Sequence, residues 1–366
     1  MNQSKSKNIL LVANTSWYLL NFKSSLIKKL VSEDYFVYYF SLDSVFHHDL
    51  KRLGCERFNE KIFPSKIRNI WSFIYSKNTR SIQHIYTFTL IGAILGNLLN
   101  SLKKEKSRTY VTVTGLGNVY LLPIIGSVVL RLIYLITLKK TDYIFVQNTS
   151  DEAFIKKSCR PRTKIIHVGG SGVDTNRFNE RQMPNTKKTK LLIATRLIDN
   201  KGLKELFSAV LSLHGEYKEI FELHVAGKHD LSGASKKLRR LIHRCSTTGA
   251  VKFVGYSDEM PSIIAKYHGV ILPSYREGLS KFLLEAASVG RPLLVSDVPG
   301  CRELVEHGVN GFVFKPRNTS DLKECILQFL RLEIRTKALM GKASRELVEK
   351  KYSENSVIAK YVESLN

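Results

Sequence analysis

Four side chains in the second half of the sequence have types and spacings suited to chemistry on a phosphorylated ligand. Two are acids, Glu277 and Glu285, which lie eight residues apart. Two are bases, Arg196 and Lys201, which follow an earlier apolar run. When a group leaves a nucleoside diphosphate, negative charge grows on the phosphate, and fixed cations stabilise that charge in the transition state. Arg196 and Lys201 suit such a phosphate, whereas two carboxylates eight residues apart indicate little by their spacing alone.

The stretch Leu272–Pro299 places the acids beyond the end of a buried strand. The strand is expected to end at Pro273–Ser274, followed by a loop and an amphipathic helix over Leu279–Val289. In open α/β sheets, ligands bind beyond the carboxyl ends of strands, where helix N-termini offer unpaired N–H groups. We expect Glu285, about two turns into the helix, to face the vicinal hydroxyls of a ribose. The loop residues expected to meet a phosphate or a sugar are Glu277, Gly278, Leu279 and Ser280.

Apolar β-rich runs alternate with longer amphipathic segments along the whole chain. This pattern is typical of parallel sheets with helical crossovers, so the predicted fold class is α/β. Helices are predicted between the strands, for example over Phe22–Leu30 and Tyr120–Leu138. The predicted strands are Ile9–Ala13, Phe36–Phe40, Tyr110–Val113, Tyr143–Val146, Leu191–Thr195, Glu222–Ala226, Val251–Val254, Val270–Leu272, Leu293–Ser296 and Phe312–Phe314.

With 366 residues the chain is longer than one core usually supports, so two α/β domains are expected. We predict a first domain over residues 1–176 and a second over residues 191–345. Residues 177–190 form a polar run that contains a proline, which indicates a linker between the domains. The helical segment 346–366 is predicted to pack back on the first domain.

The charge of the chain favours negatively charged partners. Lys and Arg outnumber Asp and Glu by 57 to 32, which gives a net charge of +25. Nucleic acid, an anionic membrane surface and phosphate-bearing substrates all fit this charge. The five cysteines form no C-x-x-C pair, so neither a disulfide framework nor a zinc site is predicted. The start of the chain lacks the features of a signal peptide, and we expect a cytoplasmic protein.

The segment Val119–Leu138 is mostly apolar over a length that spans a bilayer, about 20 residues. Pro123 and Arg131 disfavour a spanning helix, so we expect a packed helix that is partly exposed where the protein docks on a membrane. A spanning helix is the alternative. Lys139 and Lys140 would assist docking on an anionic surface.

The sequence around the two acids resembles the retaining glycosyltransferases of family 4, whose hallmark is an E-x(7)-E pattern on a strand, loop and helix. Glu277 and Glu285 match that pattern. The resemblance implies the GT-B fold, in which two Rossmann-like domains face each other across a cleft. The surrounding frame, PS-x-x-EG-x(6)-EA-x(3)-G-x-P, is completed by Pro273, Ser274, Gly278, Ala286, Gly290 and Pro292.

A second match to this family lies in Leu191–Leu203, where a strand ends in Arg196 and the pair Lys201 and Gly202 follows. The resemblance implies that both basic side chains hold the donor's diphosphate. Together with Glu277, which would orient the donor sugar, they are the expected catalytic residues. Backbone amides near Gly300 are expected to reach the nucleotide. The chain contains no D-x-D pair, so we expect no metal cofactor.

The first domain is expected to bind the acceptor. Asn14 and Ser16 follow the first predicted strand, where many family members carry glycines. Thr114 and Gly115 stand where many members place a histidine that contacts the donor sugar. No catalytic histidine is therefore assigned, and His84 is only a weak substitute.

The resemblance implies transfer of a hexose or N-acetylhexosamine, with retention, from a UDP-sugar to a polyprenyl-diphosphate-linked saccharide. Such transfer would serve bacterial O-antigen, capsule or protein-glycan assembly. The expected location is the cytoplasm, peripherally on the anionic inner face of the membrane. Two alternatives remain open: a UDP-sugar epimerase of GT-B architecture, and a basic nucleic-acid-binding protein. The second is disfavoured because no nucleic-acid reader motif is present.

Overall fold

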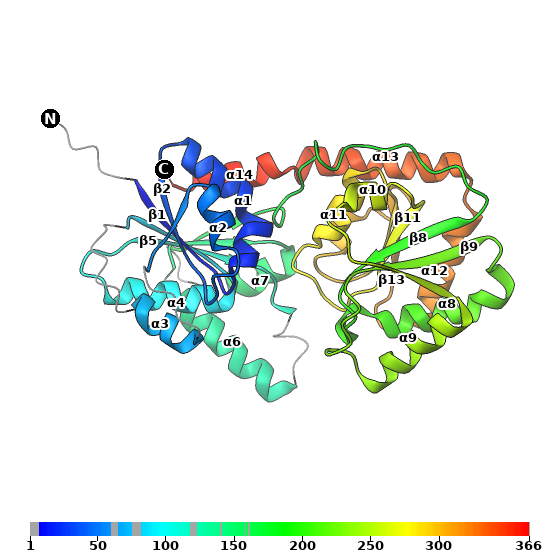
Figure 1. Ribbon diagram of the computed structural model, residues 1–366, viewed down its shortest axis with the longest axis horizontal. Coiled ribbons are helices and arrows are strands. Elements are labelled where there is room, and N and C mark those ends of the chain that lie inside the picture. The colour runs from blue at the N-terminus through cyan, green and yellow to red at the C-terminus, as the bar shows by residue number, and fades with distance from the viewer. Residues whose placement is uncertain are drawn as a thin grey trace. The chain divides into compact units, whose positions relative to one another are not determined.

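The computed structural model describes residues 7–59, 65–74, 82–117, 123–139, 141–157, 159 and 162–365. The chain divides into two compact units, each built on one parallel sheet (Figure 1). Unit 1 contains Met1–Ser171 together with Asn355–Asn366, and unit 2 contains Gly172–Glu354.

Unit 1 has a seven-stranded parallel sheet with the order β3-β2-β1-β4-β5-β6-β7. Both faces of its central strands are buried: in β1, Ile9 and Leu11 pack on one side, and Leu10 and Val12 on the other. Burial on both faces explains why these strands are continuous apolar runs. The strands are β1 (Asn8–Val12), β2 (Phe36–Phe40), β3 (Cys55–Arg57), β4 (His84–Phe88), β5 (Arg108–Val113), β6 (Tyr143–Val146) and β7 (Lys164–His167).

Helices cover both faces of this sheet (Figure 1). On one face, α1 and the last helix of the chain, α14, pack against the strands, with Tyr361 of α14 in the core. On the other face lie α3, α4 and α6, which contribute Phe73, Leu95 and Tyr134 to the buried clusters. The helices are α1 (Ser16–Ser32), α2 (His47–Arg52), α3 (Lys66–Ile74), α4 (Thr89–Leu102), α6 (Ile124–Leu138), α7 (Thr149–Lys156) and α14 (Glu354–Glu363).

Unit 2 has a six-stranded parallel sheet with the order β10-β9-β8-β11-β12-β13. This is the order of a Rossmann fold, in which the chain starts at the centre, builds outward and returns to the centre. The switch point therefore lies between β8 and β11. The strands are β8 (Thr189–Ala194), β9 (Phe221–Ala226), β10 (Val251–Gly255), β11 (Gly269–Leu272), β12 (Leu293–Ser296) and β13 (Gly311–Phe314).

The helices of unit 2 form two packed groups around one continuous core. In one group α8 packs against α9 and α12, and in the other α11 packs against α10 and α13. The helices are α8 (Leu203–Tyr217), α9 (Lys236–Thr248), α10 (Met260–Ile264), α11 (Lys281–Ser288), α12 (Thr319–Arg331) and α13 (Ile334–Lys351), with the short 3-10 helices η1 (Asp199–Lys201) and η2 (Arg302–Leu304).

The boundaries between the units differ from the predicted ones at 176 and 346. The expected linker is packed on unit 2, because the buried guanidinium of Arg291 donates hydrogen bonds to the carbonyl oxygens of Arg181 and Gln182, both at 2.9 Å. Arg345 likewise donates to the carbonyl oxygen of Phe178 at 2.7 Å. Since α13 packs against α11, the chain joins unit 1 only after Glu354.

Strands β3, β4 and β7 were not predicted. Strand β3 has only three residues, and polar or charged residues shorten the apolar runs of β4 and β7. Helix α6 begins at Ile124, whereas residues 118–122 and Lys140 lie outside the described residues. Among the residues that the structure describes, no helix has both the length and the apolar character needed to cross a membrane.

Candidate functional site

Lys201 and Glu277 meet at the switch point of unit 2. Lys201 ends η1, after β8, and Glu277 lies in the loop between β11 and α11. Because β8 and β11 are paired in the sheet, their carboxyl ends open at the same place. Lys201 Nζ lies 2.5 Å from Glu277 Oε1, and the two side chains are only 17% and 16% exposed. The structure thus joins a cation and an anion that are 76 residues apart in the sequence.

The Glu277 carboxylate is held in place by the surrounding loops. Ser274 Oγ donates a hydrogen bond to the same Oε1 atom at 2.6 Å. The backbone N–H of Glu277 donates to the carbonyl oxygen of Pro299 at 3.0 Å, and that of Tyr275 donates to the carbonyl oxygen of Asn200 at 2.9 Å. These bonds tie together the loops that follow β8, β11 and β12. The other carboxylate oxygen, Oε2, accepts no hydrogen bond from the described residues.

Two glycines allow these loops to approach so closely. Gly202 has a φ of 66°, and a Cβ atom there would collide with the carbonyl oxygen of Pro273. Gly300 has a φ of 83°, and a Cβ atom there would collide with the backbone of Glu277. Both positions therefore require glycine for conformation and for space. This packing by itself requires a glycine at position 202. A contact between Gly202 and the donor stays a prediction.

The remaining loop residues expected to meet the ligand are partly used inside the protein. Gly278 and Leu279 are half-buried in the loop. The hydroxyl of Ser280 caps α11 by accepting from the Leu283 N–H, and its own N–H donates to the carbonyl oxygen of Gly300 at 3.1 Å. The N–H of Gly300 donates to Glu303 Oε2 at 2.8 Å. The Gly300 amide, which is expected to reach the nucleotide, is therefore already hydrogen-bonded to Glu303 in this structure.

Glu285 lies on α11, half-buried, one turn after Lys281. Its carboxylate has no hydrogen-bond partner among the described residues. Burial raises the pKa of Glu285 to about 7, although the positive charges of Lys281 and Arg177 act in the opposite direction. A carboxylate in this state is poised to accept hydrogen bonds from a ligand's hydroxyl groups.

Arg196 lies in the loop between β8 and η1 and is exposed. Its guanidinium makes no hydrogen bond or ion pair with the described residues, and the structure does not bring it into contact with Lys201 or Glu277. The segment between β8 and α8 therefore carries two cations: Lys201, which pairs with Glu277, and Arg196, which has no partner among the described residues.

The expected acceptor residues of unit 1 differ in their surroundings. Asn14, at the carboxyl end of β1, is half-buried, and its Oδ1 atom is buried without a hydrogen-bond partner. Ser16 is fully buried, and both its N–H and its hydroxyl donate to Asp43 Oδ1. Its hydroxyl also accepts from the N–H of Phe46 at 3.2 Å. The polar groups of Ser16 thus serve the fold, and its contact with an acceptor stays a prediction.

Thr114 and Gly115 follow β5 and are half-buried. Their loop is fixed by the buried carboxylate of Asp151, which accepts from the N–H of Leu116 at 3.1 Å. Gly115 has a φ of 114°, which favours glycine at this position. Both residues remain at the carboxyl edge of the sheet, where ligands of parallel sheets bind.

His84 lies away from the carboxyl ends of the strands. It begins β4, at the amino end of the sheet, and its Nδ1 atom is hydrogen-bonded to the Tyr110 hydroxyl at 3.0 Å. Burial and the neighbouring Arg108 lower the pKa of His84 to about 4. The imidazole is thus neutral and packed within the fold.

One positioning group was missed in the sequence. Tyr275 precedes Glu277 by two residues, and its hydroxyl bonds both carboxylate oxygens of Glu205 at 2.9 Å. The guanidinium of Arg317 lies over the Tyr275 ring, 4.5 Å from its centroid. This cluster anchors the loop that carries Glu277 to helix α8. No sequence signal indicated it, since Tyr275 falls on a variable position of the motif.

The arrangement at the switch point suits an anion with hydroxyl groups. Lys201 and Arg196 supply positive charge, and Glu277 Oε2 and Glu285 supply hydrogen-bond acceptors. A phosphorylated sugar combines these features, because its phosphates need cations and its hydroxyls need acceptors.

Comparison with known proteins agrees with this chemistry. Residues 174–347 match the family model described as Glycosyl transferases group 1. A curated relative from Campylobacter jejuni, N,N'-diacetylbacillosaminyl-diphospho-undecaprenol alpha-1,3-N-acetylgalactosaminyltransferase, is 24% identical over 269 residues, which is 69% of each chain.

Two solved structures share the fold over nearly the whole chain. Sucrose-phosphate synthase from Thermosynechococcus elongatus superposes with a TM-score of 0.78 at 15% identity and covers 98% of both chains. Anabaena HepE in complex with UDP and glucose superposes with a TM-score of 0.77 at 19% identity, covering 98% of this chain and 99% of that one.

The two Rossmann-like units have the GT-B fold of these solved structures. The matches of the sequence itself indicate a glycosyltransferase. More particularly, unit 2 carries the domain of the glycosyl transferases group 1. The likeness to family 4 that the motif around Glu277 and Glu285 indicates is thereby confirmed.

Proposed function

We propose that this glycosyltransferase moves a hexose or an N-acetylhexosamine from a UDP-sugar to a polyprenyl-diphosphate-linked saccharide, with retention of anomeric configuration. The observation that carries the proposal is the Lys201–Glu277 pair at the switch point of a group 1 glycosyl transferase domain. The HepE complex with UDP and glucose supports the donor class. The name of the Campylobacter relative supports a lipid-linked acceptor. Assembly of a bacterial surface polysaccharide, such as O-antigen or capsule, is the corresponding process.

In the proposed reaction the bond between the sugar's anomeric carbon and the diphosphate oxygen breaks. The acceptor hydroxyl oxygen forms the new bond, and its proton passes to an oxygen of the departing diphosphate. Lys201 and Arg196 stabilise the charge that develops on the departing diphosphate, so no metal ion is needed. Glu277 keeps Lys201 in place and accepts hydrogen bonds from the donor sugar through Oε2. Glu285 accepts hydrogen bonds from the ribose hydroxyls.

The test is transfer of a radiolabelled sugar to a lipid-linked acceptor. Removing one preorganised charge-stabilising group typically lowers kcat about 100- to 1,000-fold, and we expect this for Lys201→Ala. Glu277→Gln should also lose most activity, because it removes the charge that holds Lys201. Lys204→Ala is the matched control, since Lys204 lies on the first turn of α8 and pairs with Asp199 at 3.0 Å.

Activity near that of the parent in Lys201→Ala would refute the proposed role of the pair. The epimerase alternative is tested by incubating each UDP-sugar without an acceptor. Formation of an epimer under these conditions would favour that alternative, whereas a transferase leaves the sugar configuration unchanged.

The proposed location is the cytoplasm, at the inner face of the membrane, because the acceptor is anchored in the bilayer. The net charge of +25 supports this location. Each basic residue near an anionic leaflet contributes about 1 kcal/mol of attraction. Nucleic acid is not a proposed partner.

A further inference from the structure

Exposed apolar side chains are concentrated on one face of unit 1. Helices α3, α4 and α6 lie together in one layer on the lower side of this unit in Figure 1, with α4 packed against both neighbours. Their inner sides fill the core, but their outer sides carry more than half of the exposed large hydrophobic side chains of the described residues. Ile124 and Ile125 are 82% and 80% exposed, and Trp71 is 56% exposed. We call this outer surface the apolar face.

The charged residues within the three helices have one sign. Helices α3, α4 and α6 contain Lys66, Arg68 and Arg131 but no aspartate or glutamate. Lys66 and Arg68 are exposed and form no ion pair with the described residues. A solvated protein surface normally mixes both signs, so an apolar surface with basic groups alone indicates an anionic partner.

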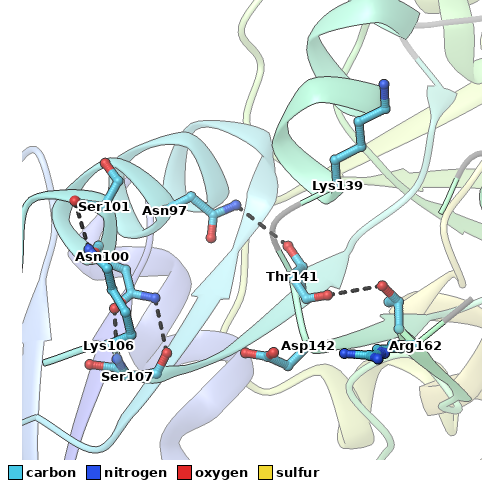
Figure 2. A pocket seen from close by; sticks show the side chains of 10 residues that line it. Asn97, Asn100, Ser101, Lys106, Ser107, Lys139, Thr141, Asp142 and Arg162 are labelled. Atoms are coloured by element: carbon cyan, nitrogen blue, oxygen red, sulfur yellow. Dashed lines mark hydrogen bonds between the residues drawn. The ribbon is translucent and has the colours of Figure 1, made fainter. Parts of the chain in front are cut away.

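A polar cavity of about 510 Å³ adjoins this layer where α4 and α6 end (Figure 2). In Figure 2, Asn100 and Ser101 of α4 line one side, and Lys139 and Arg162 stand on the other. The one acidic residue that lines it, Asp142, is held by the N–H and the hydroxyl of Thr109, at 2.8 and 3.0 Å. Lys139 and Arg162 are exposed and form no ion pair with the described residues. The layer is thus bordered by free cations near both α3 and the end of α6.

We propose that the apolar face docks on the surface of an anionic lipid bilayer. Its aliphatic side chains and Trp71 enter the interfacial region, and the basic residues at its edges bind lipid phosphates. Tryptophan and basic residues are the groups that anchor interfacial helices in this way. A second copy of the chain is disfavoured as the occupant, because two identical basic faces would repel each other. The proposal rests on the proposed function for its purpose, since a lipid-linked acceptor is reached from the bilayer surface.

The two tryptophans of the chain, Trp17 and Trp71, permit a direct test. In full-length Trp17→Phe, Trp71 is the sole tryptophan and reports on the apolar face. The probe is vesicles of phosphatidylcholine alone or mixed with phosphatidylglycerol, without any donor sugar. We expect a blue shift of the emission with the mixed vesicles, a weaker one with phosphatidylcholine, and a reduced one at high salt.

Two variants in this background separate the apolar from the ionic contribution. Ile124→Asn combined with Ile125→Asn should weaken binding to mixed vesicles at least tenfold. Lys66→Glu combined with Arg68→Glu should weaken it at least tenfold at low salt. Leu339→Asn is the control, because Leu339 is a 61% exposed apolar residue on α13 of unit 2, and it should bind like the parent.

Unchanged vesicle binding in both double variants would overturn the proposal. Loss of a dimer in Ile124→Asn/Ile125→Asn, without vesicle binding by the parent, would assign the face to a second copy instead. Vesicle binding without any sugar transfer would contradict the proposed function and leave the docking surface standing. If the chain transfers sugar to a detergent-dispersed acceptor but does not bind vesicles, the proposed function is supported and the docking surface is refuted.

Discussion

At the scale of single residues, the site contains two carboxylates in different environments. Glu277 is paired with Lys201 at 2.5 Å, whereas Glu285 has no hydrogen-bond partner among the described residues. Burial without a partner disfavours the ionised form, which is why the pKa of Glu285 rises to about 7. Such a residue lowers the stability of the free protein and strengthens the binding of a ligand that donates hydrogen bonds to it.

Replacing Glu285 should change how stability depends on pH. Because its pKa is raised from 4.5 to about 7, the folded chain binds more protons than the unfolded chain between these values. The free energy of unfolding therefore falls as the pH rises through this range. Glu285→Gln removes the titration, so it should be about 1 to 3 kcal/mol more stable than the parent at pH 8 and little different at pH 5. Urea unfolding followed by circular dichroism measures both values.

The control for this measurement is Glu324→Gln on α12. Glu324 is exposed and pairs only with Arg331, at 3.3 Å, among the residues that the structure describes. Exposed pairs contribute little, so this variant should keep the pH profile of the parent. An identical profile for Glu285→Gln would show that Glu285 does not titrate as described.

At the scale of elements, the site depends on the contact between the loop after β11 and the start of α8. Gly202 permits this contact through its φ of 66° and its missing side chain. The hydrogen bond from the Tyr275 N–H to the carbonyl oxygen of Asn200, at 2.9 Å, holds the two segments together. Lys201 reaches Glu277 only because of this packing.

Gly202→Ala should therefore destabilise unit 2 and displace Lys201. Gly249→Ala is a matched control, since Gly249 ends α9 with a φ of 71° and an added Cβ atom there would meet open space. The control incurs only the left-handed backbone strain, about 1 kcal/mol. Gly202→Ala adds a collision with backbone and should cost about 3 kcal/mol or more. Equal urea midpoints for the two variants would contradict this account.

At the scale of the whole molecule, the chain leaves unit 1, builds unit 2 and returns with α14 to complete the first core. Tyr361 is 1% exposed, and its hydroxyl accepts a hydrogen bond from Lys23 at 3.1 Å. Its ring centroid lies 4.2 Å from that of Phe145. The last helix is therefore part of the core of unit 1.

Tyr361→Ala should lower the stability of unit 1 by about 3 to 5 kcal/mol, the usual cost of removing a buried aromatic ring. Both tryptophans lie in unit 1, so tryptophan fluorescence during urea unfolding reports on this unit. Ile334→Ala, at a 42% exposed position of α13, is the control and should leave the fluorescence midpoint unchanged. A midpoint for Tyr361→Ala equal to that of the parent would show that α14 is dispensable.

Much of the fold was predictable from local sequence. The runs Phe36–Phe40, Tyr143–Val146 and Leu293–Ser296 are strands with the bounds that were predicted, because strands buried on both faces are continuous apolar segments. Strands β3, β4 and β7 lacked this signal. The linker was predicted from its polar composition, but the buried guanidinium of Arg291 holds part of it on unit 2.

The sequence by itself determined the α/β class, the presence of two domains and the motif that carries Glu277 and Glu285. These properties depend on the order of residues within short segments, and that order can be read directly from the sequence. Only the tertiary structure decided that Lys201 pairs with Glu277, that Ser16 serves the fold and that α3, α4 and α6 expose a common apolar face. Such contacts depend on strand order and helix packing, which join residues far apart in the chain.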